Sequence, residues 1–162
     1  MSQAEEFDEQ AVQQITENLA NEIEREFKEH IGTVDGEPEI DEAFIKKIIK
    51  SFEEKSTVPK PGGVGAFASD STSDLSTSYG IAKLHVGQQT FSATSVGVLS
   101  NIPGFSYVRG TLQGRQGYVG RSLPWGYFTV VTSNFKLTSQ CIYFSKTPIK
   151  EFKKGWGSGR WN

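Results

Sequence analysis

Residues 127–145 read YFTVVTSNFKLTSQCIYFS and decide the fold of the C-terminal part of the chain. Strand-favouring residues fill Tyr127–Phe135 and Gln140–Ser145, with a Ser-Asn turn signal between them. In the second strand, hydrophobic side chains alternate onto both faces. A strand of this kind packs against a core on one side and needs a cover on the other. The candidates for that cover are the N-terminal part of this chain, a second chain or a ligand.

The same pattern extends over residues 79–162. Turn signals that contain Gly, Asn and Pro separate short segments in which apolar and polar side chains alternate with a period of two residues. Short strands at this spacing predict an antiparallel, Greek-key-like eight-stranded β-barrel, because closure removes exposed strand edges. The candidate strands are Tyr79–Val86, Thr90–Val98, Phe105–Leu112, Gln116–Arg121, Tyr127–Phe135, Gln140–Ser145 and Ile149–Lys153.

Residues 1–55 have a helical pattern instead. Apolar residues recur every three to four positions from Phe7 to Ile31 and again from Ile40 to Phe52. Gly32 can end the first helix and Asp41 can cap the second. We expect a helical hairpin that packs on itself or on the rest of the chain. The alternatives are a partner-docking or oligomerising helix pair and a cleaved or autoinhibitory segment.

Between these parts, residues 56–78 read STVPKPGGVGAFASDSTSDLSTS and predict a flexible linker. Prolines block a helix, glycines loosen the backbone, and the Ser/Thr/Asp stretch is well solvated. The GGVG piece has no Gly-Lys-Ser/Thr after it and is not a phosphate-binding loop. The predicted fold class is therefore α+β, with an acidic helical segment at 1–55, a linker at 56–78 and a basic all-β domain at 79–162.

Charge divides the chain in the same way. Residues 1–60 carry 16 acidic and 7 basic side chains, a net charge of −9, whereas residues 61–162 carry 3 acidic and 10 basic ones, a net charge of +7. All eight Tyr and Trp residues lie in the second part. This asymmetry indicates that the two parts have separate roles.

Several function classes are disfavoured by the residue types present. No apolar run is long enough to span a bilayer, and we expect no signal peptide in the acidic N-terminal sequence. Cys141 and His85 form the only Cys/His combination in the β part, but both lie inside predicted strands. We find no nucleophile elbow, no carboxylate pair in the β part and no metal-ligand cluster. The sequence therefore predicts a protein that is not an enzyme and has no metal or cofactor.

Basic and aromatic residues of the β part predict a surface that binds anions. Tryptophan flanked by Lys and Arg is typical of membrane interfaces and serves equally for base stacking. Alternatively, the tryptophans plug the barrel ends and the lysines maintain solubility. The acidic helices can also dock on the basic barrel and compete with an external anion. The candidate ligand-binding residues are Arg109, Arg115, Tyr118, Arg121, Trp125, Lys150, Lys153, Lys154, Trp156, Arg160 and Trp161.

Five short motifs follow one another in the β part: residues 90–92 (TFS), 102–104 (IPG), 109–112 (RGTL), 142–144 (IYF) and 155–161 (GWGSGRW). In this order they resemble the actinobacterial virulence-associated (Vap) proteins. The resemblance implies a compact eight-stranded antiparallel barrel without enzymatic activity. It also implies a secreted factor that acts on host cells through lipid membranes. The acidic helical hairpin has no counterpart in that family.

We therefore expect a non-enzymatic, secreted effector or interaction protein whose basic, aromatic barrel engages an anionic surface, with membrane lipid as the first candidate. The alternative is a carbohydrate- or nucleic-acid-binding module regulated by its acidic helical segment, with a cytoplasmic location. The expected partners are anionic lipid or another anionic surface, the chain's own acidic helices, and a second copy joined through the helical hairpin.

Overall fold

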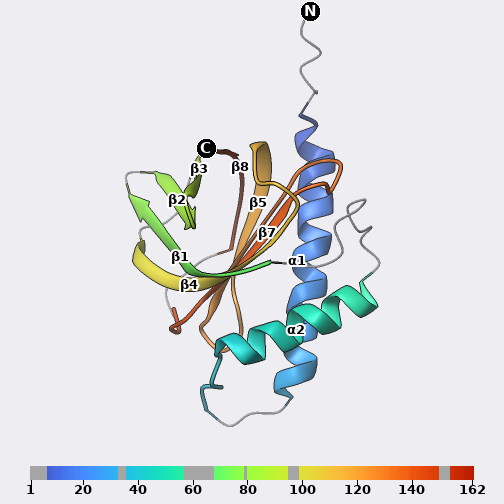
Figure 1. The fold of residues 1–162 in the computed structure, drawn as a ribbon, viewed down its shortest axis with the longest axis vertical. Helices are drawn as coiled ribbons and strands as arrows, with labels where there is room; N and C mark the ends of the chain where they lie inside the picture. Colours follow the sequence, from blue (N-terminus) through green and yellow to red (C-terminus); the bar gives the residue numbers. More distant parts are fainter. Residues whose placement is uncertain (1–6, 33–35, 57–67, 79, 95–98, 150–153) are drawn as a thin grey trace, which may run out of the picture.

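The computed structural model describes residues 7–32, 36–56, 68–78, 80–94, 99–149 and 154–162. Two α-helices precede eight β-strands that close into an antiparallel barrel (Figure 1). This arrangement confirms the predicted α+β class, with an N-terminal helical hairpin followed by an eight-stranded barrel. The elements are α1 (Glu9–Ile31), α2 (Glu42–Lys55), β1 (Ala68–Ser78), β2 (Ile81–Val86), β3 (Gln89–Thr94), β4 (Leu99–Arg109), β5 (Gly114–Ser122), β6 (Phe128–Ser133), β7 (Gln140–Ser145) and β8 (Gly155–Trp161).

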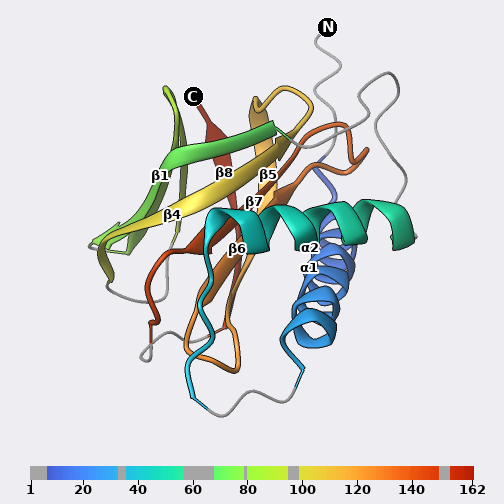
Figure 2. The same ribbon diagram turned by 60° about the horizontal axis from the view of Figure 1, so that its bottom comes forward.

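Two of the helix boundaries fall where the sequence predicts them, at Gly32 and Asp41, and the structure adds Asp8 as the cap of α1. The Asp8 carboxylate accepts a hydrogen bond from the Ala11 amide at 3.1 Å, and the Asp41 carboxylate accepts one from the Phe44 amide at 2.8 Å. α1 stops at Gly32, where φ is +63°, a backbone conformation that glycine adopts without steric cost. The two helices cross on the outside of the barrel (Figure 2).

The strands close in the order β1-β2-β3-β8-β5-β6-β7-β4. The C-terminal strand β8 therefore lies between β3 and β5, and β4 joins β1 to β7. Alternate side chains of all these strands point inward, because successive residues of a strand face opposite sides of the sheet. Buried residues that fill the barrel interior include Leu75, Leu84, Phe91, Ile102, Tyr118, Phe128, Cys141, Tyr143 and Trp161.

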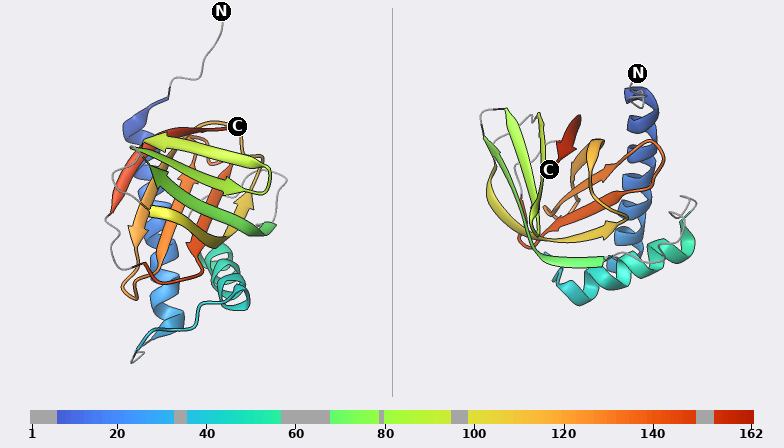
Figure 3. Two further views of the ribbon diagram at one scale, coloured as in Figure 1. Left: turned by 90° about the vertical axis from the view of Figure 1, so that its left-hand side faces the viewer. Right: turned by 45° about the horizontal axis from the view of Figure 1, so that its top comes forward.

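A second core lies outside the barrel wall, between the helices and strands β4 to β7. Figure 3 shows α1 on one side of the barrel and β2 and β3 on the opposite side. The two-sided strands are thus covered by the chain's own helices. The buried residues of this helix–barrel core include Leu19, Ile23, Phe27, Ile45, Ile48, Ile49 and Phe52 from the helices and Phe105, Tyr107, Val119, Val131, Ile142 and Phe144 from the barrel.

The linker prediction was wrong for residues 68–78, which form strand β1. This strand pairs with both β2 and β4, and Leu75 lies opposite Leu84 on one side and Ile102 on the other. The error has a physical cause: Ser, Thr and Asp favour turns when they are exposed, but here alternate positions are buried in a closed barrel. The barrel therefore begins at residue 68 rather than 79. Parts of three predicted strands, residues 79, 95–98 and 150–153, lie outside the described residues.

Candidate functional site

Two of the predicted ligand-binding residues, Tyr118 and Trp161, point into the barrel. Both are buried, and the Trp161 indole Nε1 donates a hydrogen bond to Gln116 Oε1 at 3.1 Å. The Tyr118 hydroxyl donates to the backbone carbonyl of Thr94. Desolvation raises the pKa of Tyr118 above its ordinary value. These rings fill the barrel and do not form an external aromatic surface.

The other two tryptophans pack under α1. Trp125 and Trp156 are partly buried against the helix–barrel core, and the Trp125 ring lies 6.4 Å from the ring of Phe27. A methyl group at Gly117 would collide with Trp156 and with Val12 of α1, so the glycine provides the space in which the indole lies. Both indoles therefore help to attach the helix to the barrel wall.

Two of the predicted arginines face acidic residues of the helices. The Arg121 guanidinium lies 3.1 Å from the Glu24 carboxylate and donates a second hydrogen bond to Asn21, both on α1. Arg109 is almost completely buried, and burial lowers the pKa of its guanidinium while the negative charge of Glu53 on α2 opposes that shift. Neither arginine can reach an external surface in this structure.

Arg115 is the exposed member of this set. Its guanidinium lies 3.1 Å from the Glu9 carboxylate and 4.1 Å from the centroid of the Phe7 ring. The Arg115 side chain is 45% exposed, whereas that of Arg121 is only 10% exposed. Solvent screens the outer ion pair strongly, so it stabilises the fold less than the inner one.

A row of basic residues runs from Arg115, at the edge of the helical cover, onto the barrel wall that the helices leave free. The strand register places Lys83 opposite Ser92, Ser92 opposite Arg160, and Arg160 opposite Arg115. Neighbouring strands are about 4.8 Å apart, so the row extends over roughly 15 Å of surface. Lys83, Arg160 and Arg115 are exposed, and we call these three residues the basic row. Their inward-facing neighbours along the strands are Leu84, Trp161 and Gln116.

The strands around the basic row carry small and hydroxylated side chains and no carboxylate, and the carboxylate nearest the row is that of Glu9 on α1, which pairs with Arg115. The segments 81–94, 114–122 and 155–161, which contain β2, β3, β5 and β8, hold no Asp or Glu. Ile81 shares the outward face of β2 with Lys83 and is 50% exposed. Of the remaining predicted residues, Lys154 is exposed, and Lys150 and Lys153 lie outside the described residues.

The sequence analysis included Arg115 and Arg160 among the candidate residues but not Lys83, and it did not predict that the three are neighbours. The missing information is the register across β2, β3, β8 and β5, which joins segments far apart in the chain. Side-chain alternation along the strands could have revealed part of this arrangement from the sequence. Because strands alternate, Tyr118 must face away from Arg115 and Arg121, and Trp161 must face away from Arg160.

The structure separates Cys141 from His85. Cys141 is buried inside the barrel, whereas His85 alternates with the inward-facing Leu84 and Val86, and its Nδ1 lies 3.0 Å from Thr90 Oγ1. Within the part of the chain that is described, no group of three or more His, Cys, Asp or Glu residues could hold a metal ion. Neither described helix is long and apolar enough to cross a membrane.

Comparison of the chain with family models, with curated proteins and with solved structures gave no match.

Proposed function

We propose that this is a non-enzymatic interaction protein that binds an anionic surface, membrane lipid first, through the basic row. The single observation that supports this function is the alignment of Lys83, Arg160 and Arg115 on one exposed face that carries no carboxylate on its strands. Hydroxyl side chains beside the row, such as Ser92, can donate hydrogen bonds to phosphate oxygens.

The expected affinity follows from the number of cations. A Lys or Arg near an anionic membrane contributes about 1 kcal/mol, so Lys83 and Arg160 together contribute about 2 kcal/mol, and Arg115 adds less because the Glu9 carboxylate already offsets its charge. Partial burial of Ile81 in the headgroup region adds less than the roughly 1.5–3 kcal/mol of complete burial. A binding free energy of this size is typical of a reversible, salt-sensitive peripheral contact and not of a permanent anchor.

The burial of the tryptophans favours lipid headgroups over single-stranded nucleic acid as the ligand. Base stacking needs exposed rings, and Trp125, Trp156 and Trp161 are all partly or fully buried. The same fact means that membrane binding depends on charge and not on indole insertion. The proposal that the protein is a secreted effector is supported only by the resemblance to Vap proteins.

Vesicle co-sedimentation of the full chain tests this function. The vesicles consist of phosphatidylcholine with or without phosphatidylserine, at low and at high salt. Replacement of two row cations (Lys83→Gln with Arg160→Gln) should weaken binding about 30-fold. Lys136→Gln with Lys146→Gln is the matched control, because it removes the same charge from exposed positions outside the row.

The control variant should retain most of the binding. Equal losses in the two double variants would show that net charge, and not the basic row, binds the membrane. Absence of phosphatidylserine-dependent pelleting would overturn the proposal. Salt-dependent retention of single-stranded DNA on a filter without vesicle binding would favour the nucleic-acid alternative instead.

A further inference from the structure

A hydroxyl group lies between two cations on the outer face of the barrel. The strand register places Lys83 of β2 opposite Ser92 of β3, and Ser92 opposite Arg160 of β8. Ser76 of β1 lies opposite Lys83 on the other side. Neighbouring strands are about 4.8 Å apart, so the two cations are roughly 10 Å apart at the backbone. The order of side chains across the wall is therefore hydroxyl, cation, hydroxyl, cation.

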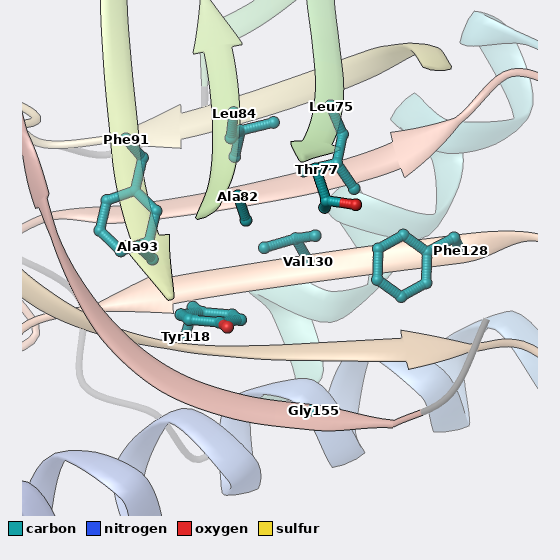
Figure 4. Close-up of a pocket in the computed structure, with 10 residues that line it drawn as sticks. All are labelled: Leu75, Thr77, Ala82, Leu84, Phe91, Ala93, Tyr118, Phe128, Val130 and Gly155. Atoms are coloured by element: carbon teal, nitrogen blue, oxygen red, sulfur yellow. The ribbon is translucent and has the colours of Figure 1, made fainter. Parts of the chain in front are cut away.

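These side chains project outward because their neighbours along the strands fill the barrel. Figure 4 shows Leu84 and Ala93, which follow Lys83 and Ser92 in the sequence, pointing into the interior. Successive residues of a strand face opposite sides of the sheet, so Lys83 and Ser92 point outward, and Arg160 is exposed on β8. The cavity that Leu84 and Ala93 line has a volume of about 30 Å³, which is enough for a water molecule and not for a lipid chain. A larger ligand therefore binds on the outer face.

The close approach of β3 and β8 brings Ser92 next to Arg160. Gly159 has no side chain, and a Cβ added there would collide with the Ser92 carbonyl oxygen and with the Ala93 side chain. Glycine therefore permits the spacing of the two strands at this point. Because Gly159 directly precedes Arg160, the same contact fixes the backbone from which the guanidinium extends. Paired strands, and not a loop, thus hold the cation beside the hydroxyl, which makes the arrangement precise.

The two cations and the hydroxyl between them are available to a ligand. Among the described residues, neither Lys83 nor Arg160 has an ion-pair partner, and Ser92 Oγ has no hydrogen-bond partner. By contrast, the hydroxyl of Thr90, two residues before Ser92 on the same face of β3, lies 3.0 Å from His85 Nδ1. Lys83, Ser92 and Arg160 therefore offer two positive charges and one hydroxyl donor to a single ligand. Such a ligand has a negative charge and several acceptor oxygens.

A phosphomonoester matches these donors. Its three terminal oxygens carry a charge of about −1.5 to −2 at pH 7. A guanidinium can bind two of these oxygens as a fork, an ammonium can bind the third as a point charge, and a hydroxyl can donate to any of them. A phosphodiester head group, such as that of phosphatidylserine, has two terminal oxygens and a single phosphate charge. The three donors are therefore used more completely by the monoester.

We propose that Lys83, Ser92 and Arg160 form a site for the phosphomonoester head group of a membrane lipid such as phosphatidic acid. This inference rests on the proposed function and names the head group that the basic row selects. The Lys83 and Arg160 side chains are long enough to converge above the Ser92 hydroxyl. Arg115 contributes general attraction to the surface and not a phosphate contact, because its guanidinium pairs with Glu9 at 3.1 Å.

Co-sedimentation of the full chain with two kinds of phosphatidylcholine vesicle tests the proposal. One kind contains phosphatidic acid, and the other contains twice as much phosphatidylserine, so that the surface charge is similar. The wild-type chain should bind the phosphatidic acid vesicles about tenfold more tightly, because the monoester gains further charge-assisted hydrogen bonds. Glycerol 3-phosphate, which has the same head group without acyl chains, is titrated by calorimetry. It should bind more weakly than the vesicles, because it lacks the surrounding anionic surface.

Two variants locate the head group. Arg160→Lys keeps the charge and removes the guanidinium fork, and Ser92→Ala removes the hydroxyl. Each should lower the affinity for phosphatidic acid vesicles about fivefold and leave the affinity for phosphatidylserine vesicles unchanged. Thr90→Val is the matched control, because it removes a hydroxyl from the same face of β3 that His85 already engages, and it should keep the preference. The urea midpoint of each variant is measured in parallel to confirm that it is folded.

The results separate this inference from the proposed function. Equal binding of the two kinds of vesicle by the wild-type chain refutes selection of a phosphomonoester, while the membrane function stands. If Thr90→Val loses as much of the preference as Ser92→Ala, the assignment of the site to Ser92 fails. If glycerol 3-phosphate binds as tightly as the vesicles, the ligand is a soluble phosphate, and the assignment to a membrane lipid fails. If neither kind of vesicle pellets the protein, the proposed function fails together with this inference.

Discussion

Substitution of Phe27 by alanine tests whether the helices and the barrel are one folded unit. Phe27 is fully buried in α1, and its ring lies 4.4 Å from Phe144 of β7 and 5.8 Å from Phe44 of α2 between centroids. Removal of a buried phenyl ring costs about 3–5 kcal/mol, which includes the lost burial and the cavity left behind. We expect a loss in this range for Phe27→Ala.

Urea unfolding followed by tryptophan fluorescence and by circular dichroism at 222 nm measures this loss. Trp125 reports on the helix–barrel core and Trp161 on the barrel interior. With a slope of about 2 kcal/mol per molar urea, a loss of 4 kcal/mol lowers the midpoint by about 2 M. The two signals should move together, because the helices and the barrel share one core.

Phe135→Ala is the matched control. Phe135 is 52% exposed after β6, so its removal should change stability by no more than about 0.5 kcal/mol. A loss below about 1 kcal/mol for Phe27→Ala would refute a shared core. An early helical transition at 222 nm, with barrel fluorescence unchanged, would show that the hairpin is a separate appendage.

The remaining predictions concern charge. Arg121→Ala should cost about 1–3 kcal/mol in urea unfolding, because it removes a partly buried guanidinium that pairs with Glu24 at 3.1 Å and bonds to Asn21, and leaves Glu24 only the longer, exposed contact with Lys28 at 3.8 Å. Arg115→Ala should cost less than about 1 kcal/mol, because its pair with Glu9 is exposed. Desolvation and the charge of Asp74 raise the pKa of Tyr143 far above its ordinary value. A raised pKa of this kind stabilises the fold below about pH 10, the pKa of an unfolded tyrosine, and the contribution is lost as pH rises above it. Tyr143→Phe should therefore weaken the alkaline loss of stability. The phenolate absorbance at 295 nm that distinguishes wild type from Tyr143→Phe should appear only as the protein unfolds.

Sequence reasoning succeeded where the signals are local. The predicted cap at Asp41 and the predicted stop at Gly32 lie within one helical turn of the backbone groups that they satisfy. Strand β1 failed because its Ser/Thr/Asp composition is shared by loops, and only pairing with β2 and β4 makes it a strand. The basic row was missed for a similar reason: Lys83 and Arg160 are distant in the chain, and a nonlocal register brings them together.

The energy with which the helices are buried also determines whether an external anion can displace them from the barrel. Seven large helix side chains are buried in the helix–barrel core, which corresponds to about 10–20 kcal/mol as an upper bound. An anionic surface that gains about 1 kcal/mol for each cation cannot displace such a cover. The helices are therefore a fixed part of the fold, and not a lock that an anion opens.

Although the helices stay on the barrel, their negative charge affects how the protein approaches an anionic surface. The acidic helices lie over β4 to β7, and the basic row lies across β2, β3, β8 and β5 (Figure 3). The molecule is thus negative on the helical side and positive on the wall that carries Lys83 and Arg160, while Arg115 lies at the border and pairs with Glu9 of α1. An anionic surface repels the first side and attracts the second, so charge selects the orientation in which the protein approaches. In that orientation the exposed Ile81 and the outward-facing Arg160 lie toward the surface, so both side chains can contact its headgroups.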